Sequence, residues 1–279
     1  MAHHRVKGDR LAKAGLLQIL LHSIYARNEA FVLRIFDRTI KIGFLNGRGK
    51  PILKLLARVL GFLPTAEIVS LDRALDFVNT IDRMGKAEFA VGPCVCQKAL
   101  NQRKGIYMKD LVVLYGAESY KRASAEYRDI DIAEVRQLLK DLQDEGMMQA
   151  FYACMRSKGW VFVICGCECE ICLPFRAHRA AGGVMSPGPD IVSFDREKCA
   201  ACGTCVDRCH FGANWLNGSL VVELDKCYGC GLCVATCSSG ARTMIQREGY
   251  KSRYYPLELI EKERATVITE PAGEVVTRP

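Results

Sequence analysis

The sequence contains one stretch twice, as Glu197-Lys-Cys-Ala-Ala-Cys-Gly-Thr-Cys-Val-Asp-Arg-Cys209 and as Asp225-Lys-Cys-Tyr-Gly-Cys-Gly-Leu-Cys-Val-Ala-Thr-Cys237. The two copies are 28 residues apart, and Gly212-Ala213 and Gly240-Ala241 keep the same offset. Between them, Asn217-Gly218 predicts the turn of a β-hairpin. Each copy is too small to bury a core of its own, so the repeat indicates that the two halves pack together around something buried.

Each half carries four cysteines in the pattern C-x2-C-x2-C-x3-C. Three cysteines at steps of three can surround one corner of a cubane iron–sulfur cluster, whereas the fourth cannot reach the same cluster and ligates the other one. Zinc sites use two C-x2-C pairs instead, so this spacing does not fit zinc. The eight cysteines are Cys199, Cys202, Cys205, Cys209, Cys227, Cys230, Cys233 and Cys237.

On these motifs, residues 195–245 resemble the bacterial-type dicluster ferredoxin module. The resemblance implies two 4Fe–4S clusters, one held by Cys199, Cys202, Cys205 and Cys237 and the other by Cys227, Cys230, Cys233 and Cys209. One departure is that the proline usual after the fourth cysteine is replaced by His210 and Ser238. A hydrogen-bond donor beside a cluster sulfur would change the reduction potential. We interpret His210 as a surface residue.

Seven further cysteines precede this module, and six of them form tight groups, Cys94-Val-Cys96 and Cys165-Gly-Cys-Glu-Cys-Glu-Ile-Cys172. A reducing compartment gives no reason to crowd thiols unless a metal binds them. The arrangement also loosely resembles cysteine-rich regions that precede dicluster modules in some redox proteins of anaerobes. We therefore expect a third metal site, iron–sulfur or zinc, with residues 94–96 lying against residues 165–172. Its candidate ligands are Cys94, Cys96, Cys165, Cys167, Cys169 and Cys172.

Two glutamates lie between these cysteines in the sequence. Glu168 and Glu170 either support the metal site or belong to a solvated turn. The seventh cysteine, Cys154, is interpreted as a small buried hydrophobic residue.

The cysteine content and the first residues of the chain indicate the compartment in which the protein functions. The chain has 279 residues, of which 15 are cysteines, and it begins with a polar segment rather than an apolar signal. An odd number of clustered cysteines indicates metal binding in a reducing compartment, so we expect a cytoplasmic protein. The longest uncharged run, between Lys13 and Arg27, is too short to span a membrane.

The net charge of +8 is concentrated at the N-terminal end. Residues 1–60 carry twelve basic and three acidic side chains, so they account for +9 and the remainder for −1. Such a region suits an acidic surface on a partner protein or an anionic lipid surface, or it is the solvated face of amphipathic helices. The basic residues are Arg5, Lys7, Arg10, Lys13, Arg27, Arg34, Arg38, Lys41, Arg48, Lys50, Lys54 and Arg58.

The periodicity of apolar residues predicts an α+β protein in four parts. Residues 1–93 are expected to form a helical basic docking region, and residues 94–185 an α+β cysteine-rich region that ends in a small-residue linker. Residues 186–245 are expected to form the pseudo-twofold dicluster domain, and residues 246–279 a tail.

Three details of this organisation can be compared with a structure. Leu20 and Ile24 are expected on the buried face of a first helix. Ser70 and Asp131 are expected to cap later helices, the second of which is followed by a hairpin.

The most direct interpretation is an electron-transfer protein or subunit that relays single electrons through two or three clusters to a partner oxidoreductase of anaerobic metabolism. An alternative is a stand-alone metalloenzyme with an open site between Cys94 and Cys172. A redox-responsive DNA binder is a third alternative, because a helix followed by a hairpin is also found in winged-helix proteins. However, residues 132–145 carry more acidic than basic side chains, so no nucleic acid is expected as a partner.

Overall fold

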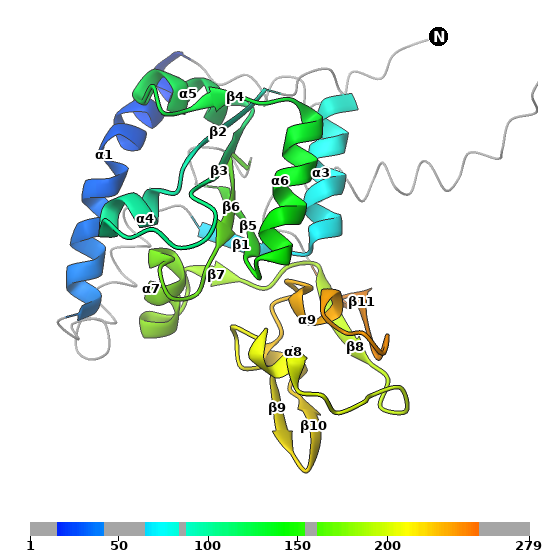
Figure 1. The fold of residues 1–279 in the computed structure, drawn as a ribbon. Helices are drawn as coiled ribbons and strands as arrows, with labels where there is room; N and C mark the ends of the chain where they lie inside the picture. The colour runs from blue at the N-terminus through cyan, green and yellow to red at the C-terminus, as the bar shows by residue number, and fades with distance from the viewer. Residues whose placement is uncertain (1–15, 42–64, 84–87, 154–160, 251–279) are drawn as a thin grey trace, which may run out of the picture.

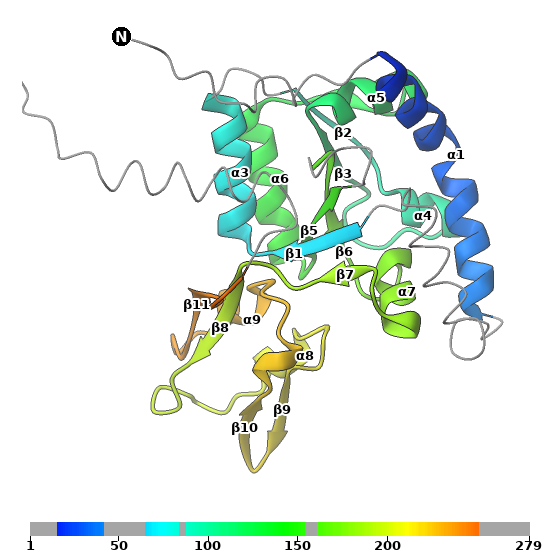
Figure 2. The same ribbon diagram turned by 180° about the vertical axis from the view of Figure 1, so that it is seen from behind.

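The computed structural model describes residues 16–41, 65–83, 88–153 and 161–250. A seven-stranded sheet carries helices on both faces, and a small cysteine-rich module lies beyond one end of it (Figures 1 and 2). The protein therefore has an α+β fold. None of the described helices is long and apolar enough to cross a membrane.

The large sheet has the strand order β4-β2-β3-β6-β5-β1-β7. All neighbouring strands are antiparallel except β1 and β7, which are parallel. Strands β2 and β5 are buried along their whole length, because helices cover both faces. The strands are β1 Thr65–Val69, β2 Phe89–Pro93, β3 Met108–Val113, β4 Arg128–Asp129, β5 Met148–Ala153, β6 Val163–Cys167 and β7 Met185–Ser186.

Two layers of helices enclose this sheet. Helices α3 (Leu71–Arg83) and α6 (Ile132–Asp144) cover one face, and the remaining helices cover the other (Figure 2). Fully buried aromatic residues fill the space between the layers, such as Phe77 of α3 against Phe151 of β5. The helices of the second face are α1 Leu16–Lys41, α4 Val95–Leu100, α5 Tyr115–Ala123 and α7 Leu173–Ala181.

Both predicted helix caps are confirmed. The backbone N–H of Arg73 donates to Ser70 Oγ over 3.3 Å, and the N–H of Glu134 donates to Asp131 Oδ1 over 2.8 Å. Each side chain thus satisfies an N–H group that has no partner within its helix. The strands of the predicted hairpin after α6 are β5 and β6, which pair antiparallel.

The prediction that residues 1–93 form a helical region is wrong at two places. Strands β1 and β2 lie within that range and pair with β5 and β3 of the following region, so no boundary separates the two regions at residue 93. Both are short runs of mostly apolar residues, which fit interior strands better than a helix face. The predicted linker also differs, because it contributes β7, which pairs with β1. Residues 42–64 of the predicted helical region lie outside the described residues.

Helix α1 is present, but its orientation differs from the prediction. Leu20 and Ile24 are 56% and 53% exposed, whereas His22 and Asp37 are buried. Polar contacts fix this orientation. Ser23 Oγ donates to the carbonyl of Ser119 over 3.1 Å, and Arg176 and Asp37 form an ion pair of 2.8 Å. The apolar periodicity identified the helix but not the face that is buried.

The C-terminal module extends from β8 to β11, which pair antiparallel. Its two repeats have the same local structure, since α8 and α9 each begin directly after a glycine with positive φ, Gly203 at 82° and Gly231 at 76°. The predicted turn at Asn217-Gly218 is confirmed, because β9 and β10 form a hairpin around it. The elements are β8 Asp190–Phe194, α8 Thr204–Asp207, β9 Asn214–Asn217, β10 Ser219–Val222, the 3-10 helix η4 Leu224–Lys226, α9 Leu232–Ala235 and β11 Arg242–Gln246.

Candidate metal centres

The module contains two small cavities, and four cysteines line each of them. Cys199, Cys202, Cys205 and Cys237 line one cavity, which we call the outer site. Cys209, Cys227, Cys230 and Cys233 line the other, which we call the inner site. In each set, three cysteines come from one repeat and the fourth from the other. The chain thus forms the same two groups that the resemblance assigns to two clusters.

Local backbone geometry produces these cavities. The glycines before α8 and α9 let the chain turn sharply, so that the third cysteine of each repeat lies in the first turn of a helix. Backbone N–H groups then point at sulfur atoms, with Ala201 donating to Cys199 Sγ over 3.4 Å and Ala213 to Cys209 Sγ over 3.2 Å. Such donors stabilise thiolates and the negative charge of an iron–sulfur cluster.

A buried arginine lies between the two sites. Arg242 is 3% exposed, donates through Nη1 to Cys233 Sγ of the inner site over 3.7 Å, and also lines the outer site. Its Nη2 has no hydrogen-bond partner among the described residues. An unpaired buried guanidinium N–H is costly unless an acceptor is supplied. An anionic cluster would supply one, so the residues present fit iron–sulfur clusters.

The two sites differ in exposure. Cys202 of the outer site is exposed, whereas Cys233 of the inner site is buried. Burial raises the pKa of the Cys230 thiol to about 12 and that of Cys233 to about 11. Both thiols must lose their protons to bind iron, so cluster binding at the inner site is coupled to proton release.

Comparison with known protein families agrees with this geometry. Residues 191–238 match the 4Fe-4S dicluster domain. The matched segment includes all eight cysteines of the repeat, and domains of this kind carry iron–sulfur clusters that serve in electron transfer. No match to the chain was found among curated proteins.

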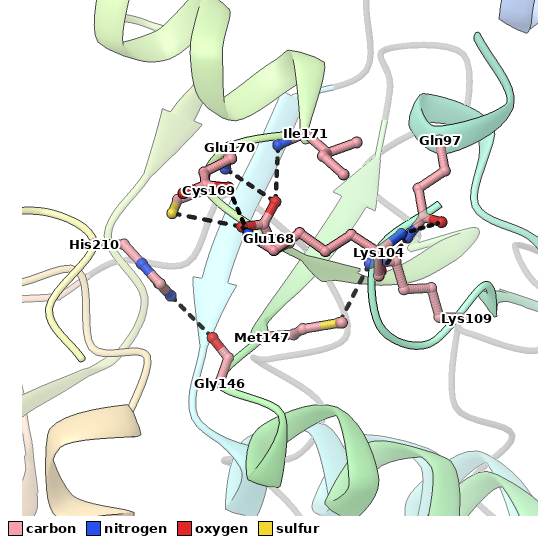
Figure 3. A network of polar contacts seen from close by, with 10 residues as sticks. All are labelled: Gln97, Lys104, Lys109, Gly146, Met147, Glu168, Cys169, Glu170, Ile171 and His210. Atoms are coloured by element: carbon pink, nitrogen blue, oxygen red, sulfur yellow. Dashed lines mark hydrogen bonds and ion pairs between the residues drawn. The ribbon is translucent and has the colours of Figure 1, made fainter. Parts of the chain in front are cut away.

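The dicluster domain is attached to the sheet domain by contacts that sequence reasoning did not predict. Asp190 of β8 accepts hydrogen bonds from Arg73 and Ser70 at the start of α3. His210, interpreted above as a surface residue, is half-buried and donates through Nε2 to the carbonyl of Gly146 over 2.9 Å (Figure 3). The ring of His210 thus anchors the domain below α6.

The upstream cysteines come together around a third cavity, of about 130 Å³, between α1, α7 and the sheet. Cys94 and Cys96 lie at the start of α4, and Cys172 directly precedes α7. The backbone N–H of Leu173 donates to Cys96 Sγ over 3.4 Å, so the two cysteine segments are in direct contact. The cysteines that line this cavity are Cys94, Cys96, Cys165 and Cys172.

Hydrogen bonds between thiols connect five of the upstream cysteines. The pKa of Cys96 is lowered because Cys172 and Cys94 donate to its sulfur. The pKa of Cys167 is lowered in the same way by Cys165 and Cys172. Among the residues that the structure describes, however, no three cysteine, histidine or carboxylate side chains converge on a point that would hold a single metal ion.

The remaining two cysteines behave differently. Cys169 is half-buried, and its sulfur lies 3.9 Å from Glu168 Oε1 (Figure 3). It does not line the cavity. Cys154 lies outside the described residues.

The two glutamates beside these cysteines form a clamp. Lys104, in the loop after α4, forms ion pairs with Glu168 and Glu170 (Figure 3). Glu168 Oε2 also accepts the N–H of Ile171 over 2.8 Å, and Gln97 Nε2 donates to the carbonyl of Lys104 over 2.8 Å. The clamp therefore ties the segment of Cys94 and Cys96 to the turn before Cys172.

Two carboxyl groups at the same cavity, one half-buried and one buried, were missed by sequence reasoning. Glu29 of α1 accepts a hydrogen bond from Tyr120 over 2.9 Å, and Asp110 of β3 accepts one from Tyr127. Burial, together with the charge of Asp110, raises the pKa of Glu29 to about 8, and burial raises that of Asp110 to about 7. Neither residue belongs to a motif, because each reaches the cavity only through the packing of α1 and the register of β3.

Proposed function

We propose that this protein relays single electrons through two 4Fe–4S clusters to a partner oxidoreductase. Cys199, Cys202, Cys205 and Cys237 hold the outer cluster, and Cys209, Cys227, Cys230 and Cys233 hold the inner one. The observation that carries the proposal is that each cavity of the dicluster domain is lined by four cysteines drawn from both repeats. The clusters, when bound, supply the capacity to accept and release single electrons.

The protein's own side chains adapt the domain to this role. Arg242 places a buried positive charge beside both cysteine sets and stabilises the more negative, reduced state of a cluster. The exposed Cys202 brings the outer site to the surface, where a partner can approach. The inner site faces the sheet instead, through residues such as Phe211. Electrons are therefore exchanged with the partner at the outer site.

The charge distribution supports an acidic partner. Arg27, Arg38 and Lys41 are exposed along α1, in the part of the basic region that the structure describes. A surface of this charge attracts acidic partner surfaces, and added salt weakens the attraction. We propose a partner oxidoreductase of anaerobic metabolism in the cytoplasm, with contact to an anionic membrane surface as the other use of the same charge.

We propose that the upstream cysteines hold a third metal centre, iron–sulfur or zinc. A stand-alone metalloenzyme is the second candidate function, and the cavity lined by Glu29 and Asp110 beside these cysteines favours it. The structure gives no such support to a DNA binder. Strands β5 and β6, which would form the wing, are interior strands of the sheet.

The proposal is tested by preparing the full chain under anoxic conditions and measuring metals and electron paramagnetic resonance (EPR) spectra. We expect about eight iron atoms per chain, or more if a third cluster is present, and EPR signals of reduced 4Fe–4S clusters. Transfer of electrons to a co-purifying oxidoreductase would support the role as a relay, whereas substrate turnover by the isolated chain would favour the enzyme. Fewer than eight iron atoms, with zinc in their place, would contradict the two-cluster proposal.

Substituting Arg242→Met should make the reduction potentials more negative, because the reduced clusters lose a buried positive charge. A one-electron potential shifts by about 59 mV for each 1.4 kcal/mol of lost stabilisation. Redox titration followed by EPR measures the shift at unchanged iron content. Lys226→Met is the matched control, because it removes an exposed charge that is paired with Glu223 and should leave both potentials unchanged. Equal potentials in the two variants would show that Arg242 only fills space.

A further inference from the structure

The cavity formed by the upstream cysteines shares a feature with the two sites of the dicluster domain. Each of the three cavities is lined by four cysteines. We infer that Cys94, Cys96, Cys165 and Cys172 hold a third iron–sulfur cluster, which neighbours the inner site. This inference rests on the proposed relay function and assigns the type, the ligands and the place of the third centre.

The arrangement of the sulfur atoms favours a cluster over a single zinc ion. A zinc ion requires four donors within about 2.3 Å of one point. Within the described residues no three donors converge in that way, either here or among the eight cysteines of the dicluster domain. The four sulfurs instead border a cavity of about 130 Å³, which is larger than the cavities of about 20 Å³ at the two sites of the dicluster domain. A group of several atoms fits this space better than one ion.

The surroundings of the cavity suit an anionic cluster that is shielded from water. Cys94, Cys96 and Cys172 are 4%, 8% and 5% exposed. Apolar side chains such as Leu33 and Val163 contribute to the walls. The N-terminus of the nine-residue α7 points its first free N–H at Cys96 Sγ, so both a hydrogen bond and the helix dipole stabilise negative charge there.

Cys167 and Cys169 are excluded as ligands by their positions. Neither of them lines the cavity. The sulfur of Cys167 lies 3.5 Å from Tyr152 Oη, and Cys165 and Cys172 also donate to it. Cys167 thus lies beside two of the ligands, and it can donate its own S–H to them once they bind iron as thiolates, whereas Cys169 lies beside the clamp at Glu168.

Helix α7 connects the third cavity to the inner site. Phe175 follows Cys172 by three residues, and its ring lies 5.5 Å from that of Phe211. Phe211 stacks on Tyr228 with 3.9 Å between ring centroids and 3° between planes. Phe211 and Tyr228 both line the inner site, and Tyr228 also hydrogen-bonds His178 of α7 over 2.7 Å.

The contacts of α7 therefore indicate an electron path in which the inner site lies between the third centre and the outer site. In each step one electron leaves a reduced cluster and reduces the oxidised neighbour, with no atom transferred. The partner oxidoreductase supplies or removes the electron at the end of the series.

The test is the iron content of the full chain prepared without oxygen, before and after the double substitution Cys94→Ser/Cys96→Ser. We expect about twelve iron atoms per chain in the unmodified protein and about eight in the double variant, with the signals of the dicluster domain retained. Cys169→Ser is the matched control and should keep all twelve. The count on the unmodified chain decides the inference even if the double variant does not fold.

The possible results separate the two proposals. About eight iron atoms in both the unmodified chain and the double variant would overturn the third cluster and leave the two-cluster relay intact. One zinc per chain that the double variant loses would overturn it as well. Fewer than eight iron atoms in the unmodified chain would instead contradict the proposed function itself.

The position of the third centre next to the inner site can be tested separately, by the rate of electron transfer between them. Phe175→Leu should preserve the iron content and the potentials, because Phe175 lines neither cavity, but it should slow electron equilibration between the third centre and the inner site after pulsed reduction. Trp215→Leu, on the hairpin of β9 and β10, is the control and should leave the rate unchanged. Equal rates in the two variants would contradict the order of the centres.

Discussion

Replacing Cys230 by alanine should remove about four iron atoms per chain and unfold the dicluster domain while the sheet domain stays folded. The reason is the composition of the domain's core. Its buried apolar side chains are few and mostly small, so the clusters fill much of the interior and ligation energy becomes folding energy. These side chains are Val192, Ala213, Leu220, Leu232 and Ala241. Iron analysis and limited proteolysis measure the two effects.

Cys202→Ala provides the comparison at the exposed end of the domain. It should also remove about four iron atoms, because Cys202 is one of four ligands at the outer site. The inner site would keep its ligands and its contact with α7, so cleavage should be confined to the outer part of the domain. A Cys230 variant that keeps its full iron content and its protease resistance would show that Cys230 is not a ligand.

The dicluster domain could be predicted because the information is local. The spacing of Cys199, Cys202 and Cys205 places three sulfurs around one loop, and the resemblance to the dicluster module assigns Cys237 to the same cluster. The match to the family at residues 191–238 supports the iron–sulfur interpretation. Local signals also located the caps at Ser70 and Asp131, because each needs only one side chain and the first turn of its own helix.

The sheet domain was harder to predict because its strands pair over long distances. Asp110 lies opposite Cys165 across β3 and β6, a pairing of residues 55 positions apart that no spacing in the sequence encodes. This pairing places Cys165 at the cavity, whereas Cys94 and Cys96 reach it through α4 and Cys172 through the start of α7. Likewise, the apolar residues of α1 do not reveal which face is buried, because polar groups such as Asp37 and Ser23 fix the helix to its neighbours.

Substituting Asp190→Ala should strongly destabilise the junction between the two domains. Arg73 and Asp190 are each 6% exposed. The Arg73 guanidinium donates to Asp190 Oδ1 through Nε over 3.1 Å and through Nη2 over 3.0 Å, while Ser70 donates to Oδ2 over 2.7 Å. Removing the carboxylate leaves a buried guanidinium unpaired, which costs about 3–5 kcal/mol.

The double variant Arg73→Met/Asp190→Leu is the control, because it removes both charges and retains most of the side-chain volume. It should recover most of the lost stability, since a buried ion pair often contributes no more than well-packed apolar residues. Thermal unfolding of the cluster-loaded protein gives the comparison.

Asp190 is the first residue of β8, and its carboxylate joins that strand to the start of α3. Asp190→Ala should therefore also loosen the stack of Phe211 on Tyr228. If electron equilibration is slower in this variant at unchanged iron content, the ion pair holds the two domains in their relative position. Stability equal to that of the unmodified protein would contradict this role.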